Sequence, residues 1–174
     1  RAEQAAWRAQ RLTQQLLTFA KGGDPIVASA RLSKLARTSA ELCLAGSPVR
    51  WTLDVDPAAE WPVAVDANQI EQVLNNLLIN AEQAMPEGGT VEMSIVNVHL
   101  DEDSRSPLKP GRYVRCTVHD EGMGIAAADE VHVFDPYFST KAGGTGLGLA
   151  TSFSIVKRHE GHIQFTSTAG AGTV

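Results

Sequence analysis

The stretch that decides the fold runs from Asp66 to Met85 and reads DANQIEQVLNNLLINAEQAM. With about 100° of turn assigned to each residue, its apolar side chains fall within an arc of about 120°, which predicts a helix buried along one face. The apolar arc contains Ile70, Val73, Leu74, Leu77, Leu78, Ala81, Ala84 and Met85. Asp66 is a suitable N-cap, and Pro86 and Gly88 lie where such a helix would end.

A second stripe borders this arc and consists of side-chain amides. It contains Gln72, Asn76, Asn80 and Gln83. Asn is a poor helix former and a solvated face usually carries Glu or Lys, so the composition of the stripe is unusual. One interpretation is a Gln- and Asn-rich surface. The other is a row of neutral oxygen donors that face a polar ligand and can coordinate Mg²⁺.

Strand patterns flank the central helix on both sides. Upstream, a helical pattern over 26–44 precedes two period-2 segments at 49–55 and 61–65. Downstream, we expect strands at about 90–98 and 112–119, a helix ending near residue 159, a strand at 162–167, and a last, truncated strand that the chain enters after residue 169. Consecutive strands without a crossover helix predict a mixed, mostly antiparallel sheet. The sequence therefore predicts an α+β fold, a two-layer α/β sandwich whose helices cover one face of the sheet.

The first residues follow a different pattern. Apolar residues recur at spacings of three and four from Ala2 to Phe19, which is the seam of a helix that packs lengthwise on another helix. The run from Gly22 to Pro25 ends this helix, because glycine favours a C-terminal stop and proline restricts the residue before it. We therefore divide the chain into an N-terminal helix at 1–23 and a main domain at 24–174.

A carboxylate followed by glycines ends one of the predicted strands, in the sequence DEGMGI from Asp120 to Ile125. The carboxylate can accept a hydrogen bond from a ligand amine, while Gly122 and Gly124 let the ligand approach the backbone closely. A plain turn at the end of a strand explains the same pattern. The loop FDPYFSTK, from Phe134 to Lys141, contains three aromatic residues and is expected to pack under or close over a neighbouring feature.

A glycine-rich stretch, GGTGLGLA from Gly143 to Ala150, leads directly into a predicted helix. Glycines leave backbone N–H groups uncovered, and the N-terminus of a helix carries about half a positive charge, so the stretch can hold phosphate. It is not a P-loop, because no lysine precedes Thr151 or Ser152. A flexible glycine turn is the alternative.

Composition narrows the possible partners. The net charge is −5 and the longest basic run is the pair Lys157-Arg158, which argues against nucleic acid. No apolar run approaches the roughly 18 residues of a membrane span, so we expect a soluble, cytoplasmic piece without membrane contact. Cys43 and Cys116 lack metal-site spacing and are expected to be reduced core thiols.

Taken together, in this order and spacing, NQIEQVLNNLLINAEQAM, DEGMGI, FDPYFSTK and GGTGLGLATSFSIVKRHEGHI resemble the N, G1, F and G2 boxes of the ATP-binding catalytic domain of sensor histidine kinases, within the gyrase, Hsp90, histidine kinase and MutL superfamily. The resemblance covers about residues 49–174. It implies a Bergerat-type ATP-binding fold and protein-histidine kinase activity, with ATP and Mg²⁺ as ligands.

The resemblance also assigns site residues. Asn80 would be the metal ligand, Asn76 and Lys141 would be catalytic, and Asp120 would receive the adenine amino group. The implied nucleotide contacts are Asn76, Asn80, Gln83, Asp120, Gly122, Gly124, Ile125, Phe138, Thr140, Lys141, Gly144, Thr145, Gly146, Leu147, Gly148 and Leu149. Hydrolytic members carry a glutamate base where this chain has Asn76, and an amide cannot take a proton from water, so we expect no efficient hydrolysis.

The N-terminal sequence RLTQQLLTFAKGG resembles the end of the second helix of the dimerisation and phosphoacceptor hairpin of such kinases. None of the five histidines lies in an acceptor helix, so we expect a fragment without its own acceptor. The implied partners are the kinase's own dimerisation domain and the receiver domain of a response regulator, with a homodimer as the full-length state. Two alternatives stay open: a degenerate module that only senses nucleotide, and a protein serine kinase or ATPase of the same fold.

Overall fold

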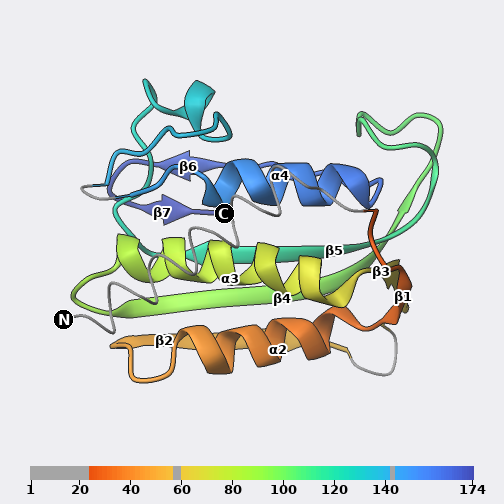
Figure 1. The fold of residues 1–174 in the computed structure, drawn as a ribbon, viewed down its shortest axis with the longest axis horizontal. Helices are drawn as coiled ribbons and strands as arrows, with labels where there is room; N and C mark the ends of the chain where they lie inside the picture. Colours follow the sequence, from red (N-terminus) through yellow and green to blue (C-terminus); the bar gives the residue numbers. More distant parts are fainter. Residues whose placement is uncertain (1–23, 57–59, 142–143) are drawn as a thin grey trace.

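The computed structural model describes residues 24–56, 60–141 and 144–174, and it arranges them in two layers. The helices of this part of the chain lie side by side across one face of a five-stranded sheet (Figure 1). They are α2 (Leu32–Cys43), α3 (Ala67–Ala84) and α4 (Gly148–Arg158). The predicted two-layer sandwich is confirmed. The expected helix at 1–23 lies outside the described residues.

The sheet has the strand order β2-β4-β5-β7-β6. Its strands are β2 (Val49–Val55), β4 (Gly89–Leu100), β5 (Gly111–Asp120), β6 (Ser167–Thr168) and β7 (Gly172–Thr173). The β2–β4 pair is parallel, whereas the β4–β5, β5–β7 and β6–β7 pairs are antiparallel. This confirms the mixed, mostly antiparallel sheet expected from the sequence.

The core lies between the helices and the inner face of the sheet. Alternate β4 residues Val91, Met93 and Ile95 are at most 3% exposed, and Leu78 at the centre of α3 is fully buried. The polar residues between them on β4 face the other side. The apolar arc read from the sequence of α3 is therefore the face that packs on the sheet, as predicted.

The predicted helix over 26–44 was wrong at its start. Residues Ala28–Ala30 form a strand, β1, which pairs antiparallel with β3 (Val63–Val65) in a separate two-stranded sheet. The backbone N–H of Ile26 also donates to the Asp66 carboxylate at 3.0 Å. Pairing with β3, which is distant in sequence, thus overrides the local helical pattern, and α2 begins only at Leu32.

The first turn of α2 is capped by a residue from another segment. Its own N-cap residue, Arg31, makes no side-chain capping hydrogen bond. Instead, the buried carboxylate of Glu60 accepts from the Ser33 backbone N–H at 2.9 Å and from the Ser33 hydroxyl. A carboxylate at this end also complements the helix dipole.

The C-terminal strand prediction at 162–167 was also wrong in its extent. Regular pairing covers only Ser167 and Thr168, because the partner strand β7 is equally short; backbone hydrogen bonds between Thr166 and Val174 extend the contact by one pair. A short 3-10 helix at Glu130–His132 was not predicted. Neither Cys43 nor Cys116 forms a disulfide, and burial raises the pKa of the Cys116 thiol to about 12. None of the described helices is long and apolar enough to cross a bilayer.

Candidate functional site

The site begins where α3 meets the start of α4. Asn76 is 7% exposed, and its side-chain amide donates to the Gly148 carbonyl at 2.9 Å and to the Ser152 hydroxyl at 3.2 Å. Asn76 therefore joins the amide stripe of α3 to the first turn of α4. Sequence reasoning missed Ser152, whose only signal was its place one turn after Gly148.

The next two amides of the stripe converge on one cation. The ammonium of Lys141 donates to Oδ1 of Asn80 at 3.0 Å and to Oε1 of Gln83 at 2.8 Å. Gln72, the first amide of the stripe, is partly buried. The structure thus brings together three residues that the sequence placed in the site, on segments about sixty residues apart.

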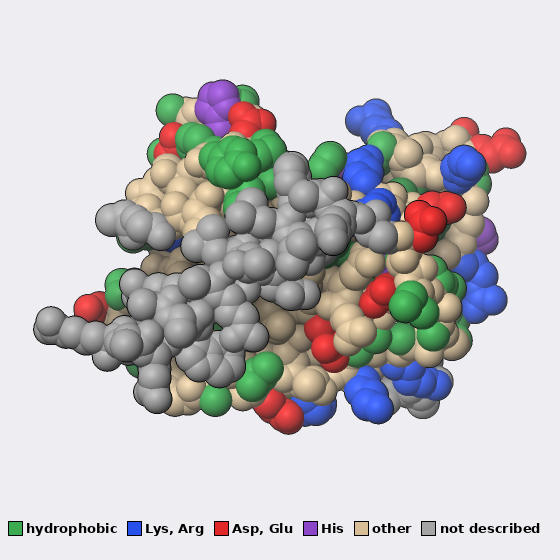
Figure 2. Space-filling model, in the orientation of Figure 1, with side chains coloured by type: hydrophobic (Ala, Val, Ile, Leu, Met, Phe, Trp, Pro, Cys, Tyr) green, Lys and Arg blue, Asp and Glu red, His purple; other side chains and the backbone are tan. Residues whose placement is uncertain are grey.

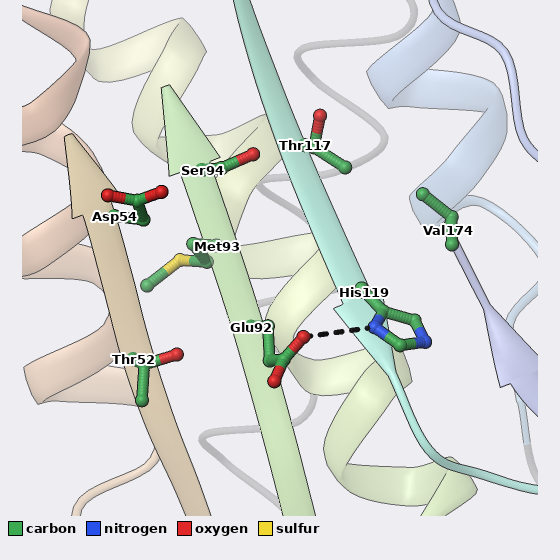
Figure 3. Close-up of a pocket in the computed structure, with 8 residues that line it drawn as sticks. All are labelled: Thr52, Asp54, Glu92, Met93, Ser94, Thr117, His119 and Val174. Carbon is green, nitrogen blue, oxygen red and sulfur yellow. Dashed lines mark hydrogen bonds and ion pairs between the residues drawn. The ribbon is translucent and has the colours of Figure 1, made fainter. Parts of the chain in front are cut away.

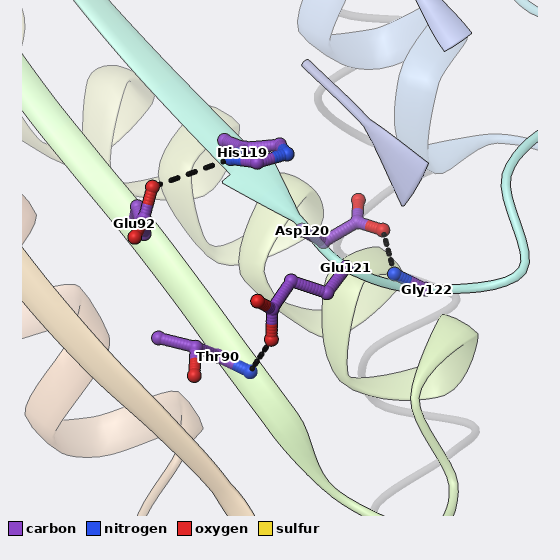
Figure 4. A network of polar contacts seen from close by, with 6 residues as sticks. All are labelled: Thr90, Glu92, His119, Asp120, Glu121 and Gly122. Atoms are coloured by element: carbon purple, nitrogen blue, oxygen red, sulfur yellow. Dashed lines mark hydrogen bonds and ion pairs between the residues drawn. The ribbon is translucent and has the colours of Figure 1, made fainter. Parts of the chain in front are cut away.

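The end of β5 turns its side chains to opposite sides (Figure 4). His119 lies 3.4 Å from the Glu92 carboxylate, whereas Asp120 accepts from the Gly122 N–H at 2.9 Å. Glu121 accepts from the Thr90 N–H at 3.0 Å, which ties the turn to β4. These contacts hold the 8% exposed Asp120 in one orientation at the end of the strand.

The two glycines of this turn are required by close packing. A Cβ on Gly122 would lie 2.5 Å from the Ala84 Cβ at the end of α3. Gly124 has φ +66°, and a Cβ there would lie 2.2 Å from the Thr168 carbonyl oxygen. The following Ile125 N–H donates to the Ser167 hydroxyl at 2.9 Å, so the turn docks on β6.

The glycine-rich segment packs against the aromatic loop. Gly146 has φ +64°, and its carbonyl accepts from the Tyr137 N–H at 3.0 Å. A Cβ on Gly146 would lie 2.3 Å from the Tyr137 carbonyl carbon. Leu147 is 1% exposed and anchors the segment, and α4 begins at Gly148. Thr145 and Leu149 flank these positions and are partly buried.

The aromatic loop is itself held by ring contacts. Phe134 lies 5.3 Å from Phe153 and 5.8 Å from Phe165, measured between ring centroids. Phe138 lies 5.4 Å from His132, and Thr140 is exposed beyond it. Figure 2 shows hydrophobic side chains exposed on this face of the molecule, and the exposed large hydrophobic residues in and just before the loop are Val131 and Tyr137.

Burial and neighbouring charges shift the pKa values of Asp120 and Lys141 in opposite directions. Burial raises the pKa of the Asp120 carboxyl above its ordinary value, although backbone hydrogen bonds from Gly122 and Thr173 oppose this shift. Desolvation lowers the pKa of the Lys141 ammonium, and the attraction of Asp120 opposes it. The opposite charges of Asp120 and Lys141 thus favour the ionised form of each group.

A shallow depression of about 480 Å³ lies elsewhere, on the sheet face opposite the helices (Figure 3). Polar side chains of the three strands β2, β4 and β5 line it, including Thr52, Asp54, Ser94, Thr117 and His119. It is separated from the Asp120 carboxylate by the sheet and shares none of the residues predicted for the site.

Comparison with known proteins matches residues 65–174 to the family described as histidine kinase-, DNA gyrase B- and HSP90-like ATPases. The chain is 35% identical over 186 residues to the sensor kinase CckA of Brucella abortus, covering 98% of this chain and 19% of CckA. It is 32% identical over 175 residues to the sensor protein FixL of Bradyrhizobium diazoefficiens, covering 99% of this chain and 33% of FixL.

Among solved structures, full-length ShkA in complex with AMPPNP superposes with a TM-score of 0.72 at 23% identity, covering 95% of this chain and 34% of ShkA. This likeness confirms the fold. The chain thus spans between a fifth and a third of the length of these curated relatives. It belongs to the histidine kinase-, DNA gyrase B- and HSP90-like ATPase family, and it carries an ATP-binding catalytic domain of the sensor histidine kinase type.

Proposed function

We propose that this catalytic domain binds Mg·ATP between α3, the end of β5 and the start of α4, and transfers the γ-phosphoryl group to a histidine. The acceptor would lie on the dimerisation hairpin of the full-length protein. From there the phosphoryl group would pass to an aspartate of a response-regulator receiver domain. A cytoplasmic location for this domain and a homodimeric full-length protein are parts of the same proposal.

One observation carries the proposal: side chains from three segments converge at the end of α3. Asn80 and Gln83 present neutral oxygens to a cation, and the turn after Asp120 docks on the end of α3, where the Met123 N–H donates to the Ala84 carbonyl at 3.1 Å. Asn76 holds the N-terminus of α4 beside them. Amide oxygens can coordinate a metal, a carboxylate can accept a hydrogen bond from the amine of a base, and a helix N-terminus can bind phosphates.

Asp120 is proposed to hold adenine. Its carboxylate accepts from Gly122 through one oxygen, so it retains acceptor capacity for the adenine amino group. Gly122 and Gly124 pack so closely against α3 and β6 that any side chain would displace the turn. We propose that this close packing leaves the base side of the turn as bare backbone, with Ile125 beside it.

The glycine-rich segment is proposed to hold the phosphates. Gly144, Gly146 and Gly148 alternate along the approach to α4, and helix N-termini favour anions through their free N–H groups and dipole. Thr145, Leu147 and Leu149 would contribute backbone contacts, and Phe138 and Thr140 would border the nucleotide from the loop. Lys141 would neutralise charge on the γ-phosphate.

The residues of α3 fit a magnesium ion. The side-chain oxygens of Asn80 and Gln83 both contact the ammonium group of Lys141, so they face one shared position. Amide oxygens are suitable Mg²⁺ ligands. When bound, Mg²⁺ would neutralise the phosphates, and the remaining coordination would come from phosphate oxygens and water. We propose Asn80 as the principal protein ligand, with Gln83 beside it.

Transfer to protein is favoured over hydrolysis. A water molecule would need a general base, and Asn76 stands where hydrolytic relatives have glutamate. In the structure its amide nitrogen already donates to Gly148 and Ser152. A histidine nitrogen attacks with its own lone pair: the N–P bond forms, the bond from phosphorus to the β–γ bridging oxygen breaks, and ADP leaves.

The test supplies the acceptor in trans. The chain is incubated with Mg²⁺, γ-labelled ATP and a separately expressed dimerisation hairpin that carries an acceptor histidine. We expect acid-labile label on the hairpin, which disappears when its histidine is replaced with glutamine. Acid-stable label would indicate a serine kinase, and label released as inorganic phosphate would indicate an ATPase. Nucleotide binding without transfer would indicate a sensing module. Each of these results would contradict the proposal.

A further inference from the structure

Lys141 occupies the oxygens that are proposed to hold the metal. Its ammonium lies 3.0 Å from Oδ1 of Asn80 and 2.8 Å from Oε1 of Gln83. These two residues are three positions apart on α3, so their side chains share one side of the helix. An ammonium is a compact cation with three donors and can satisfy both oxygens at once.

The backbone of Lys141 connects this contact to the glycine-rich segment. Its N–H donates to the Ser139 hydroxyl at 3.2 Å, and its carbonyl accepts from the Gly144 N–H at 3.0 Å. One residue thus contacts both the amide oxygens of α3 and the start of the glycine-rich segment.

We propose that Lys141 is an internal cation that competes with Mg²⁺ for Asn80 and Gln83 in the nucleotide-free domain, and that binding of Mg·nucleotide displaces it. The inference rests on the proposed function, because it takes the amide pair to be the metal site. It goes further in giving the lysine a second position, on the metal ligands, besides the γ-phosphate.

Competition follows from charge and space. An ammonium and Mg²⁺ cannot share the same two oxygens, because like charges at contact distance repel strongly. The apparent affinity for Mg·nucleotide is reduced by the fraction of molecules in which the oxygens are free. If the lysine-occupied form is about tenfold more populated, the apparent affinity falls about tenfold.

The experiment separates competition from simple attraction of phosphate by Lys141. ADP binding is measured by calorimetry with excess Mg²⁺ and with EDTA, for the wild-type chain and for Lys141→Met. ADP is used because it lacks the γ-phosphate. Loss of simple attraction would weaken both affinities, and more so in EDTA, where ADP carries its full negative charge. Loss of a competitor instead makes the binding of Mg·ADP tighter than in the wild type.

We expect the dissociation constant of Mg·ADP to fall at least about threefold in Lys141→Met, while ADP binding in EDTA does not tighten. Lys109→Met, at an exposed lysine of the β4–β5 loop, is the matched control and should leave the Mg·ADP dissociation constant at the wild-type value. An unchanged or larger Mg·ADP dissociation constant in Lys141→Met, or an equal fall in Lys109→Met, overturns the inference. Absence of ADP binding by the wild-type chain in both buffers would instead refute the proposed function.

A second measurement needs no nucleotide. The rate of reductive methylation at Lys141 is followed by mass spectrometry in the wild-type chain, in Gln83→Met and in Gln72→Met. Removing the Gln83 oxygen should increase the rate severalfold, because one of the two acceptors of the ammonium is lost. Gln72→Met should leave the rate unchanged. Equal rates in all three proteins would show that the contact with α3 does not hold Lys141 in solution.

Discussion

The side-chain amide of Asn76 donates a hydrogen bond to the backbone carbonyl of Gly148, 72 residues later, at 2.9 Å. This bond fixes the N-terminus of α4 against the middle of α3. The helix proposed to carry the metal ligand and the helix proposed to bind phosphate are thereby held in one arrangement before any nucleotide arrives. A site that is already assembled loses little conformational entropy when it binds its ligand.

Replacing Asn76 with aspartate should destabilise the domain. The carboxylate would face the Gly148 carbonyl without a hydrogen to donate, in a position that is only 7% exposed. We expect a loss of about 2–4 kcal/mol in the free energy of unfolding, measured by urea denaturation. Asn75→Asp is the control, because Asn75 uses its oxygen to accept from Cys43 and an aspartate retains that acceptor. Equal losses in both variants would contradict this role of Asn76.

Gly146→Ala should displace the segment proposed to bind phosphate, because the new Cβ would clash with the backbone of Tyr137. This effect adds to the cost of placing alanine at a positive φ. Gly146 and Gly170 both have positive φ, of +64° and +79°, but only at Gly146 would the new Cβ meet backbone, 2.3 Å from Tyr137. Gly170→Ala therefore measures the conformational cost alone, about 1 kcal/mol. We expect a larger loss of stability in Gly146→Ala, with weakened ADP binding that Gly170→Ala does not show in calorimetric titrations.

Asp120→Asn should stabilise the free domain and weaken nucleotide binding. Burial raises the folded-state pKa of Asp120 above the ordinary 3.8, so the ionised carboxylate destabilises the fold at pH values above that raised pKa. This cost vanishes as the pH falls below 3.8. The melting temperature of the variant should exceed that of the wild type at pH 7, and the difference should shrink towards pH 4.

The same variant tests the adenine role. ADP affinity of Asp120→Asn should fall at least about tenfold, because a charge-assisted hydrogen bond to the adenine amine is lost. Wild-type affinity in calorimetry would remove Asp120 from the adenine site, whatever its effect on stability.

His159 joins the other ends of the same two helices. Its Nε2 accepts from the Asp66 N–H at 3.0 Å, which requires Nδ1 to carry the proton that is donated to the Ile155 carbonyl at 2.8 Å. His159→Leu should cost about 1–2 kcal/mol in thermal or urea unfolding, because the Asp66 N–H loses its partner. His159→Gln offers both a donor and an acceptor and should recover part of this loss. If glutamine is no better than leucine, the hydrogen bonds are not the source of the stability.

The sequence predicted those parts of the fold that depend on local periodicity. The apolar arc of α3, its N-cap Asp66 and the alternation in β2 each follow from the spacing of neighbouring residues. The start of α2 was mispredicted because it depends on pairing between Ala28–Ala30 and Val63–Val65, which no local window contains. The same holds for the capping of α2 by Glu60, since a cap supplied from a later segment leaves no mark near the helix.

The site shows the same division. The amide stripe and the glycine motifs were recognised from spacing, and the structure brings Asn80, Gln83 and Lys141 into contact. The partners of Asn76 could not be inferred, because they depend on how α4 crosses α3. The contact of Lys141 with the amide oxygens was likewise not expected, since the resemblance implies only a catalytic role for this lysine. The roles of the individual residues stay predictions.

Nuclear magnetic resonance can show directly whether Mg·ATP binds between α3, the end of β5 and the start of α4. Backbone amide signals are followed while Mg²⁺ and a non-hydrolysable ATP analogue are titrated into the isotopically labelled chain. We expect the largest shifts at the side-chain amide of Asn80 and at the backbone amides of Gly122, Gly144, Gly146 and Gly148. No shift up to millimolar nucleotide, or shifts confined to the opposite sheet face around Thr52 and Thr117, would contradict this expectation.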